Sequence, residues 1–350
     1  MLTATANRLL RSQFVDLLVG PHGIDRYLEL VRPDLTVNDA RAEVVAVHRQ
    51  TARSVTLTVR PNAAWMGFRA GQFLRVGVEI DGVRHTRTYS PASSEHRGDG
   101  CLELTVTVHP DGLVSEHLHS RVRPGTILHL SSAQGDFVLP DRRSERLVLV
   151  SGGSGITPVM SMLRTLCDEG PDREIRFLHY ARTAADWLYQ REVADLTARH
   201  PAMSVEYVAT REGGRRVSQP ALGPLDDATV AVCGPPQLIE AVREIAGDAV
   251  LAETFTPPTL AVTGEAADGT LRFLRSDRIV PVGEGTLLEQ AESAGLSPEF
   301  GCRMGICRTC TCRKAAGAVR NVLSGNVSHE EDEDIQLCVS VPAGDVALEI

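Results

Sequence analysis

Half of the chain's eight cysteines lie within residues 302–312, and their spacing limits what this region can become more than any other feature. Cys302, Cys307 and Cys310 follow the pattern Cys-x4-Cys-x2-Cys, and Cys338 comes after 27 further residues. A 2Fe-2S centre needs four thiolates that converge on two irons, and three from one loop with a fourth from elsewhere can supply them. The spacing therefore predicts a 2Fe-2S cluster bound by these four cysteines.

Two alternatives stay open at the level of sequence. Structural zinc sites usually show two Cys-x2-Cys pairs or a mixture of cysteine and histidine, and this region has only one such pair. Cys312 lies close enough to Cys310 to replace it as a ligand, although the two-residue gap after Cys307 fits Cys310 better. We therefore expect Cys312 to be a packed side chain.

Composition and charge exclude several classes of function. The 350 residues carry 36 basic and 45 acidic side chains, a formal net charge of -9, with 4% aromatic residues. Nucleic acid needs a basic surface with stacking side chains, so we expect no nucleic-acid partner. The longest apolar runs, such as residues 147–150, fall far short of the roughly 18 residues of a membrane span. The N-terminal residues lack the apolar core of a signal peptide, so we expect a cytoplasmic protein.

The apolar runs divide the chain into an extension and three domains. Residues 1–40 read as short helices, and residues 41–142 contain strand-like runs separated by glycine and proline, which indicates an antiparallel β-barrel or sandwich. In residues 143–255 short apolar strands alternate with helices, which is typical of an α/β domain with a parallel sheet. A Pro-Pro pair then interrupts the chain, and residues 256–350 form the third domain. The expected strands are residues 43–48, 54–59, 73–80, 102–109 and 127–130 in the barrel, and 147–150, 175–180, 205–209 and 229–233 in the α/β domain.

Two motifs in the barrel region fit a ligand that carries phosphate and a flat ring. Arg87-Thr88-Tyr89-Ser90 ends a β-rich run, and Gly112-Leu113-Val114-Ser115 follows it. Arg87 and Tyr89 point to the same face of a strand, so the guanidinium can pair with a phosphate while the phenol ring stacks. Each motif alone is a weak signal, because strand residues of this kind are more often ordinary surface.

Two further motifs follow apolar strands of the α/β region. Ser151-Gly152-Gly153-Ser154-Gly155-Ile156-Thr157-Pro158 precedes a helical stretch, in which Thr157 can cap the helix and Pro158 can occupy its first position. The free N–H groups of such a helix start can face a diphosphate. Cys233-Gly234-Pro235 ends another strand, at the sheet edge where ligands of α/β domains bind.

In this order the four motifs resemble those of the ferredoxin-NADP reductase superfamily, and the C-terminal cysteine spacing resembles its oxygenase-reductase and desaturase-reductase branches. The resemblance runs from about residue 40 to residue 350. It implies a multidomain fold: an antiparallel β-barrel FAD domain, an α/β parallel-sheet nucleotide domain and a β-grasp (α+β) ferredoxin domain. The implied cofactors are FAD and a 2Fe-2S cluster, with NADPH or NADH as co-substrate.

The resemblance also assigns roles to residues. Arg87 would pair with the flavin diphosphate, Tyr89 would stack on the flavin ring and Ser90 would bond near its N5 atom. Cys233 and Glu253 would flank the nicotinamide, and Phe255 would cover the flavin. The remaining cofactor-binding positions are Thr88, Gly112, Val114 and Ser115 for the flavin, and Gly153, Gly155, Thr157, Pro158, Arg182, Arg211, Gly234 and Pro235 for the nucleotide.

The expected function is electron transfer from NADPH or NADH, through FAD and a 2Fe-2S cluster, to an oxygen-activating enzyme. A hydride carries two electrons while the cluster accepts one, so a flavin must stand between them. Reductase partners of bacterial fatty-acyl desaturases resemble the chain most, and an aromatic-ring dioxygenase or a haem-thiolate monooxygenase is the alternative acceptor. A flavin and iron–sulfur redox sensor without turnover is an alternative of another class.

Charge suggests two finer expectations. Arg182 and Arg211 resemble the basic residues that hold the 2′-phosphate in NADP-using members, which favours NADPH. Residues 256–350 carry 14 acidic against eight basic side chains, and the run Glu330–Asp334 lies just before Cys338. We expect this acidic face to dock a basic partner, although a solvated helix start would look the same. Residues 1–30 have an amphipathic pattern that also fits peripheral contact with a membrane.

Overall fold

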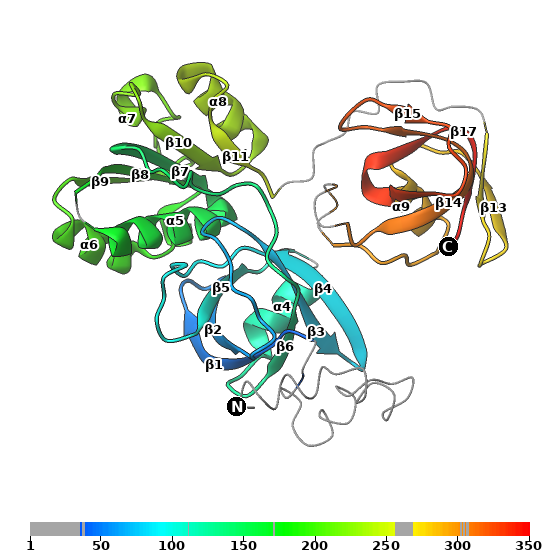
Figure 1. Ribbon diagram of the computed structural model, residues 1–350, viewed down its shortest axis with the longest axis horizontal. Helices are drawn as coiled ribbons and strands as arrows, with labels where there is room; N and C mark the ends of the chain where they lie inside the picture. The colour runs from blue at the N-terminus through cyan, green and yellow to red at the C-terminus, as the bar shows by residue number, and fades with distance from the viewer. Residues whose placement is uncertain are drawn as a thin grey trace. The chain divides into compact units, whose positions relative to one another are not determined.

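The computed structural model describes residue 36 and residues 39–110, 112–170, 172–255, 269–301, 303, 305 and 308–350. The chain separates into two compact units, Met1–Phe255 and Thr256–Ile350 (Figure 1). The helical extension expected over residues 1–40 lies almost wholly outside the described residues. No helix within the described part combines the length and apolar character needed to cross a bilayer.

The first part of unit 1 is a six-stranded antiparallel sheet in the order β4-β3-β6-β1-β2-β5. Inward-facing side chains such as Val44, Leu57 and Leu104 are fully buried and form the barrel core. A bridge between Pro91 and Leu104 joins the two edges, so the sheet curls into a barrel. The strands are β1 (Arg41–Arg49), β2 (Ser54–Pro61), β3 (Leu74–Ile80), β4 (Val83–Tyr89), β5 (Leu102–Thr107) and β6 (Ile127–Leu130).

The second part of unit 1 is a five-stranded parallel sheet in the order β11-β10-β7-β8-β9. Along β7 (Arg146–Gly152), Leu147 and Leu149 face one apolar core while Val148 and Val150 face the other, so helices must cover both faces. Figure 1 shows α5 (Ile156–Glu169) and α6 (Gln190–Arg199) on one face, with α7 (Gln219–Leu222) and α8 (Pro236–Ala246) on the other. The other strands are β8 (Glu174–Ala181), β9 (Met203–Ala209), β10 (Thr229–Cys233) and β11 (Leu251–Glu253).

Unit 2 is a mixed sheet wrapped around the one α-helix described in it, α9 (Leu287–Ser293). The strand order is β13-β12-β17-β14-β15, with β16 paired to β14, and β12 runs parallel to β17. This α+β arrangement is a β-grasp fold. Thr286 and Glu289 form a capping box that starts α9. The strands are β12 (Thr270–Phe273), β13 (Arg278–Pro281), β14 (Thr311–Asn321), β15 (Val327–Ser328), β16 (Glu333–Gln336) and β17 (Ser340–Leu348).

The multidomain fold expected from the sequence is therefore confirmed: an antiparallel barrel, a parallel α/β sheet and a β-grasp unit. Strand β4 ends in the Arg87–Ser90 motif, as the sequence indicated, and its side chains are polar and half-exposed because it lies at the sheet edge. Helix α4 (Leu113–Ser120) was not expected: it follows directly after Gly112, where only a turn motif was expected.

Candidate functional site

The nucleotide motifs meet where the strand order of the parallel sheet reverses. The chain places β8 and β9 on one side of β7, then returns to place β10 and β11 on the other side. Ser151, near the end of β7, is in register with Cys233 at the end of β10. Loops that leave neighbouring strands in opposite directions open a crevice, and this crevice is where open α/β sheets bind ligands. The sequence 151–158 and the sequence 233–235 are thus brought to one place.

Glycines allow these two loops to touch. A Cβ atom added to Gly155 would lie 2.6 Å from the carbonyl carbon of Cys233 and closer still to its oxygen. A Cβ on Gly152 would lie 2.8 Å from both Pro235 and Leu238. Real Cβ atoms do not approach so closely, so only glycine fits at either position. Gly152 was not among the expected cofactor-binding residues, although the Gly-Gly pair in the sequence was a signal for it.

Helix α5 begins earlier than the sequence pattern indicated. Gly153–Gly155 form one turn of 3-10 helix, and α5 starts at Ile156 with Gly155 as its N-cap. Thr157 and Pro158 therefore lie inside the first turn, and the expectation that Thr157 caps the helix and Pro158 opens it was wrong. The physical reason is that Gly155 adopts helical dihedrals itself, so the helix can extend back to the glycines. The Thr157 hydroxyl instead donates to the Ser154 carbonyl at 3.2 Å.

The start of α8 adds a second helix N-terminus at the same edge of the sheet. Pro235 is its N-cap, and the Gly234 N–H donates to the Glu253 carbonyl at 3.2 Å. Two helix N-termini direct free N–H groups and positive dipole ends toward this edge, which suits the diphosphate of a nucleotide.

Cys233 and Glu253 are registered partners on β10 and β11. Burial raises the pKa of the Cys233 thiol well above its usual range, with the neighbouring Glu253 as a second cause, so the thiol stays protonated. Burial also raises the pKa of Glu253 to about 8. Its Oε2 atom finds no hydrogen-bond partner within the described residues. Phe255, two residues later, packs against the core shared by α5 and the barrel.

The Arg87–Ser90 motif occupies the end of edge strand β4. Burial raises the pKa of Tyr89 far above its usual value, with Arg87 acting in the opposite direction, and its ring packs against the barrel core. The Arg87 guanidinium donates to the Thr86 carbonyl at 2.8 Å. The hydroxyl oxygens of Thr88 and Ser90 are both buried and unpartnered in the described part of the chain. Buried polar atoms are normally satisfied, so these oxygens fit a site that is completed by a polar cofactor.

Gly112 and Ser115 form the start of α4 rather than an open loop. Gly112 is the N-cap, and the Ser115 hydroxyl donates to its carbonyl at 2.9 Å. A Cβ on Gly112 would lie 3.0 Å from the His109 carbonyl oxygen and 2.5 Å from the Ser115 Oγ atom, so Ser115 would have to rotate away from its hydrogen bond. Val114 is buried in the barrel core. An eight-residue helix that begins here presents its N–H groups to an anion, which fits a flavin diphosphate.

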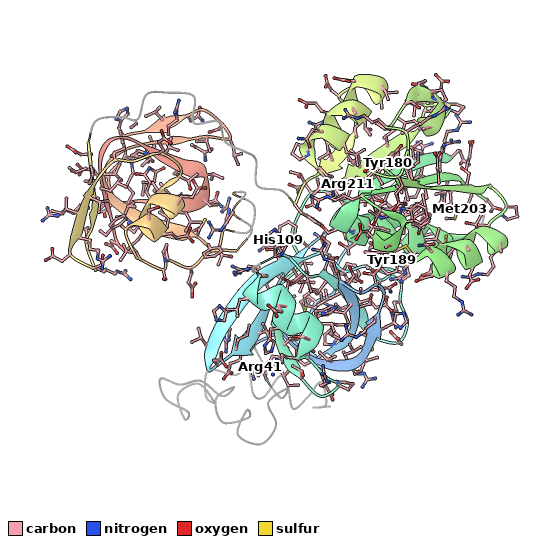
Figure 2. All side chains as sticks on the ribbon, turned by 180° about the vertical axis from the view of Figure 1, so that it is seen from behind. Arg41, His109, Tyr180, Tyr189, Met203 and Arg211 are labelled. Atoms are coloured by element: carbon pink, nitrogen blue, oxygen red, sulfur yellow. The ribbon has the colours of Figure 1, made fainter. Side chains whose placement is uncertain are left out.

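Arg182 and Arg211 lie just beyond β8 and β9, and the Arg211 N–H donates to the Arg182 carbonyl at 2.9 Å. Both residues are exposed. Figure 2 shows Arg211 near Tyr180, which is the penultimate residue of β8. The backbones of the two arginines thus meet at the carboxyl ends of the neighbouring strands β8 and β9.

Two of the four expected cluster ligands, Cys302 and Cys307, lie outside the described residues. Cys310 and Cys338 are buried in the same core, where the Leu337 N–H donates to the Cys310 carbonyl at 3.1 Å. The Gly305 N–H donates to the Cys338 sulfur at 3.3 Å, and backbone N–H groups of this kind stabilise the sulfurs of iron–sulfur centres. Gly305 has φ of +76°, which a glycine tolerates.

Cys312 belongs to strand β14 and is in register with Ile335 on β16. Its half-buried side chain packs against the core of unit 2. One contributor was missed at the sequence level: Gln336, whose side-chain amide donates to the Gly305 carbonyl at 2.8 Å and so fixes the loop that approaches Cys338. Glutamine carries no sequence signal for this role.

Comparisons with known proteins give the same three parts. The oxidoreductase FAD-binding domain model matches residues 43–139, the oxidoreductase NAD-binding domain model matches 149–244, and the 2Fe-2S iron-sulfur cluster binding domain model matches 274–343. The fold and these matches define a flavin-dependent pyridine-nucleotide oxidoreductase with an iron–sulfur domain.

Relatives match the chain over most of its length. An NADPH oxidoreductase of Mycobacterium tuberculosis is 37% identical over 339 residues, which cover 93% of this chain and 88% of the relative. A glycine betaine monooxygenase reductase subunit of Chromohalobacter salexigens is 30% identical, covering 81% and 87%. The solved structure of phthalate dioxygenase reductase is alike in fold, with a TM-score of 0.59 at 23% identity, covering 89% of this chain and 97% of that one. The chain belongs to the ferredoxin-NADP reductase superfamily with a fused C-terminal 2Fe-2S domain, and it is an electron-transfer oxidoreductase.

Proposed function

We propose that this protein takes electrons from NADPH and delivers them, through FAD and a 2Fe-2S cluster, to an oxygen-activating partner. One observation carries the proposal: Gly155 and Cys233 bring the two nucleotide motifs together in the same unit whose barrel carries Arg87–Ser90. We assign the FAD-binding barrel to residues 41–142, the nucleotide domain to 143–255 and the ferredoxin domain to 256–350.

The residues at the site fit a bound nucleotide and a bound FAD, and each of them has a specific role. The N-termini of α5 and α8 would hold the nucleotide diphosphate, and Arg87 with the start of α4 would hold that of FAD. The protonated Glu253 and the unpartnered Ser90 hydroxyl can complete hydrogen bonds to the rings that meet there. Bound FAD supplies the conversion from two-electron to one-electron transfer, and the protein positions and tunes it.

The choice of NADPH over NADH rests on Arg182 and Arg211. A guanidinium binds phosphate oxygens in a planar, two-point manner, so two exposed arginines at this edge favour a nucleotide with a 2′-phosphate. The relative from M. tuberculosis is named an NADPH oxidoreductase, which supports the same choice. NADH is the alternative co-substrate.

The acceptor is proposed at two levels. Relatives named as monooxygenase reductase subunits support an oxygenase as the partner. A fatty-acyl desaturase is our first candidate within this class, on the resemblance of the sequence to desaturase reductases, and an aromatic-ring dioxygenase or haem-thiolate monooxygenase is the second. A redox sensor would need no sustained turnover, so multiple-turnover electron delivery separates it from a reductase.

Two basic side chains offset part of the charge of the acidic run Glu330–Asp334. Arg313 pairs with Asp332 and with Asp334, both at 3.6 Å, and the fully buried Lys314 pairs with Glu333 at 3.2 Å. Only Glu330 and Glu331 of the run carry no ion pair within the described residues. We propose that these two carboxylates meet a basic partner, and that any peripheral membrane contact is made through that partner or through residues 1–30.

An anaerobic reduction experiment tests the function. NADPH added to the purified holoprotein should bleach the flavin absorbance within milliseconds to seconds and then the cluster absorbance, and NADH should be less efficient. Catalytic NADPH with an excess of an artificial one-electron acceptor should sustain many turnovers. Flavin that stays oxidised with both nucleotides would contradict the reductase, and a single turnover only would favour the sensor.

A second experiment tests docking. Glu330→Gln with Glu331→Gln should slow reduction of the partner enzyme and weaken its salt dependence, while flavin reduction by NADPH is unchanged. Glu284→Gln with Glu299→Gln removes the same charge elsewhere on unit 2 and serves as the matched control. Equal slowing by both pairs would place docking elsewhere.

A further inference from the structure

Helix α5 is held along one face by the segment that directly follows the Arg87–Ser90 motif. The Ser161 hydroxyl donates to the Ser93 carbonyl at 2.7 Å, and both groups are buried. The Thr165 hydroxyl accepts a hydrogen bond from the Glu95 N–H at 3.1 Å. Positions 161 and 165 are one turn apart, so they lie on the same helix face. Residues 93–95 therefore connect the flavin motif, three residues upstream, to the helix whose first turn faces the nucleotide.

Arg164 adds charged contacts to this junction between the barrel and helix α5, which is called the seam below. Its guanidinium donates to the Ala92 carbonyl at 2.6 Å and to Glu103 on β5 at 2.8 Å. The rest of the guanidinium binds Glu192 on α6 in a two-point pair at 2.7 and 2.6 Å. The Arg164 and Glu103 side chains are only 13% and 17% exposed, so solvent screens this pair little. Of the two carboxylates, Glu103 belongs to the barrel and Glu192 to the nucleotide domain.

Tyr189 forms a third tie beside Arg164. Its ring lies 5.2 Å from the Arg164 guanidinium carbon, and its buried hydroxyl hydrogen-bonds Thr105 on β5. Figure 2 shows Tyr189 where the nucleotide domain meets the barrel. The backbone of Tyr189 has a φ of +57°, which residues other than glycine rarely adopt. A strained backbone persists only where surrounding contacts hold it, and the hydrogen bond between the Tyr189 hydroxyl and Thr105 is one such contact.

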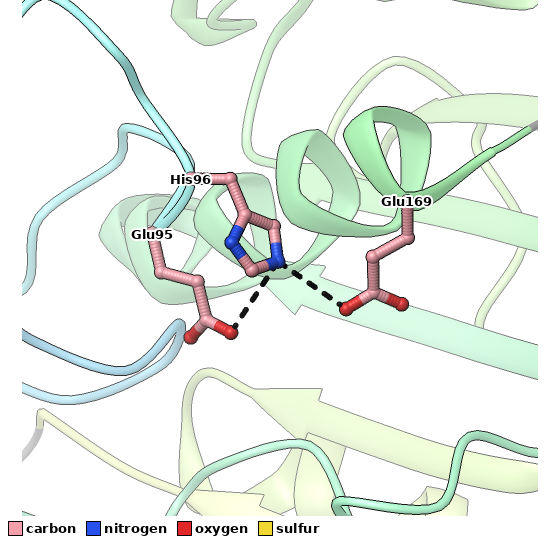
Figure 3. Close-up of side chains that lie close together, drawn as sticks. All are labelled: Glu95, His96 and Glu169. Carbon is pink, nitrogen blue, oxygen red and sulfur yellow. Dashed lines mark ion pairs between the residues drawn. The ribbon is translucent and has the colours of Figure 1, made fainter.

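The far end of α5 is tied by a cluster of charged groups (Figure 3). The His96 Nε2 atom lies 3.5 Å from Glu169, the last residue of α5, and 3.8 Å from Glu95. These three side chains have a composition that could bind a metal ion. However, the Arg143 guanidinium already lies 2.8 Å from Glu169 and 3.6 Å from Glu95, and Arg173 lies 3.4 Å from Glu169, so two arginines already balance the two carboxylates. The ion pairs of Arg143 thus join the end of α5 to the segment that carries Glu95.

We propose that Glu103, Arg164 and Tyr189 are positioning residues for hydride transfer: they fix the distance between nicotinamide and flavin by holding α5 against the barrel. The barrel and the nucleotide domain then act as one rigid body during flavin reduction. In that step two electrons and a hydrogen nucleus leave the nicotinamide, which is oxidised, and reach the flavin, which is reduced. The inference rests on this first step of the proposed function and is independent of the final acceptor.

The expected effect follows from the distance dependence of such reactions. A displacement of about 1 Å at the reacting atoms can cost on the order of 100-fold in rate, even when its cause is remote. Loss of one of these hydrogen bonds or ion pairs across the seam should therefore lower the limiting rate of flavin reduction. Affinity for the nucleotide should not change, because its diphosphate and 2′-phosphate contacts lie within the nucleotide domain.

The test compares Glu103→Gln with Glu192→Gln in the flavin-loaded, full-length protein. Each removes one carboxylate charge from Arg164, but only the first removes it across the seam. Anaerobic stopped-flow reduction over a range of NADPH concentrations gives the limiting rate and the nucleotide Kd separately. For Glu103→Gln we expect a limiting rate about 10-fold lower with Kd within 2-fold of wild type, and for Glu192→Gln both within 2-fold. Tyr189→Phe keeps the ring packing and should lower the limiting rate about 3-fold.

Several outcomes would overturn the proposal. They are wild-type limiting rates in both Glu103→Gln and Tyr189→Phe, an equal loss in Glu192→Gln, or release of flavin from the Glu103→Gln protein. A merely structural role would lower flavin content and nucleotide affinity together with the rate, so the split between rate and Kd is decisive. If the wild-type protein itself is not reduced by NADPH or NADH, the proposed function fails as well. If it is reduced and the variants match it, only the positioning role fails.

Discussion

Gly155 lies so close to Cys233 that its missing side chain is what lets the two nucleotide loops meet: an added Cβ would reach within 2.6 Å of the Cys233 carbonyl carbon. The contact joins the end of β10 to the start of α5. It lies at the point where the strand order reverses, so the geometry of the expected nucleotide site depends on one hydrogen atom in place of a methyl group.

Gly155→Ala should damage this site directly. The methyl group must displace the Cys233–Gly234 backbone, and overpacking of this kind costs about 1–3 kcal/mol. We expect lower stability of unit 1 in urea and at least 10-fold weaker NADPH binding, measured by flavin-reduction kinetics. Ser154→Ala, at the neighbouring exposed position, is the control and should behave as wild type. Wild-type affinity in Gly155→Ala would mean that the nucleotide binds elsewhere.

Arg87→Ala should release the flavin. A guanidinium that binds two phosphate oxygens contributes about 1.5–3 kcal/mol through charge-assisted hydrogen bonds, or roughly 10- to 100-fold in affinity. The ratio of flavin to protein absorbance after gel filtration measures the loss. Arg84→Ala, at the exposed end of the same strand, should keep a full complement of flavin. Equal retention in both variants would contradict the assignment.

The cluster ligands can be separated by serine substitution. Cys338→Ser and Cys310→Ser should abolish or strongly change the visible and electron paramagnetic resonance spectra of the cluster, because each removes a thiolate. Cys312→Ser should keep both spectra, since this side chain packs against the core next to its strand partner Ile335. Loss of iron in Cys312→Ser together with its retention in Cys310→Ser would reverse the assignment.

Glu253 should make unit 1 less stable as the pH rises. Burial raises its pKa from an ordinary value of 4.5 to about 8, so the folded protein keeps a proton that the unfolded chain releases. Below pH 4.5 the folded and the unfolded protein both bind the Glu253 proton, so the contribution of Glu253 to stability is fully present there. Between about pH 4.5 and pH 8 the free energy of unfolding falls, by at most about 1.4 kcal/mol per pH unit. Glu253→Gln should flatten this slope.

Urea unfolding of the Glu253 variant and wild type at pH 5.5, 6.5 and 7.5 gives the slope. Both tryptophans of the chain, Trp65 and Trp187, lie in unit 1, so intrinsic fluorescence follows the relevant part. Glu206→Gln replaces an exposed carboxylate of the same domain and is the control. Identical pH slopes in all three proteins would show that Glu253 titrates normally.

Nucleotide choice should depend on the two arginines beyond β8 and β9. Arg211→Ala should raise the KM for NADPH about 10-fold or more and leave that for NADH unchanged, because only NADPH carries the 2′-phosphate. Steady-state kinetics with both nucleotides measure the effect. Arg199→Ala, at the exposed end of α6, removes the same charge away from the crevice and should have no effect. Equal or better efficiency of wild type with NADH would contradict the preference.

The sequence predicted those features that local patterns determine. Apolar runs gave strands β6 and β10 at their observed bounds, because buried strands are continuous and end at turn residues. The start of α5 was misplaced because the three glycines before it are compatible with either a loop or a helix. Cys302 and Cys307 lie outside the described residues, so the full ligand set stays a prediction.

Contacts between distant segments could not be predicted. Arg164 and Glu103 are 61 residues apart, and neither position shows a pattern that distinguishes it from a solvated surface charge. Their meeting depends on how the parallel sheet packs on the barrel through a shared core that includes Phe137 and Leu139. The same holds for Gln336 and the Gly305 carbonyl, which only the folded unit 2 brings together.

Lys314 is the only lysine of the whole chain, and on β14 its side chain is fully buried and pairs with Glu333. Reagents and enzymes that modify lysine side chains can therefore reach one only when unit 2 opens. The rate at which Lys314 becomes labelled by an amine-specific reagent is a built-in measure of that opening, and it reports on the iron–sulfur unit alone while unit 1 stays folded.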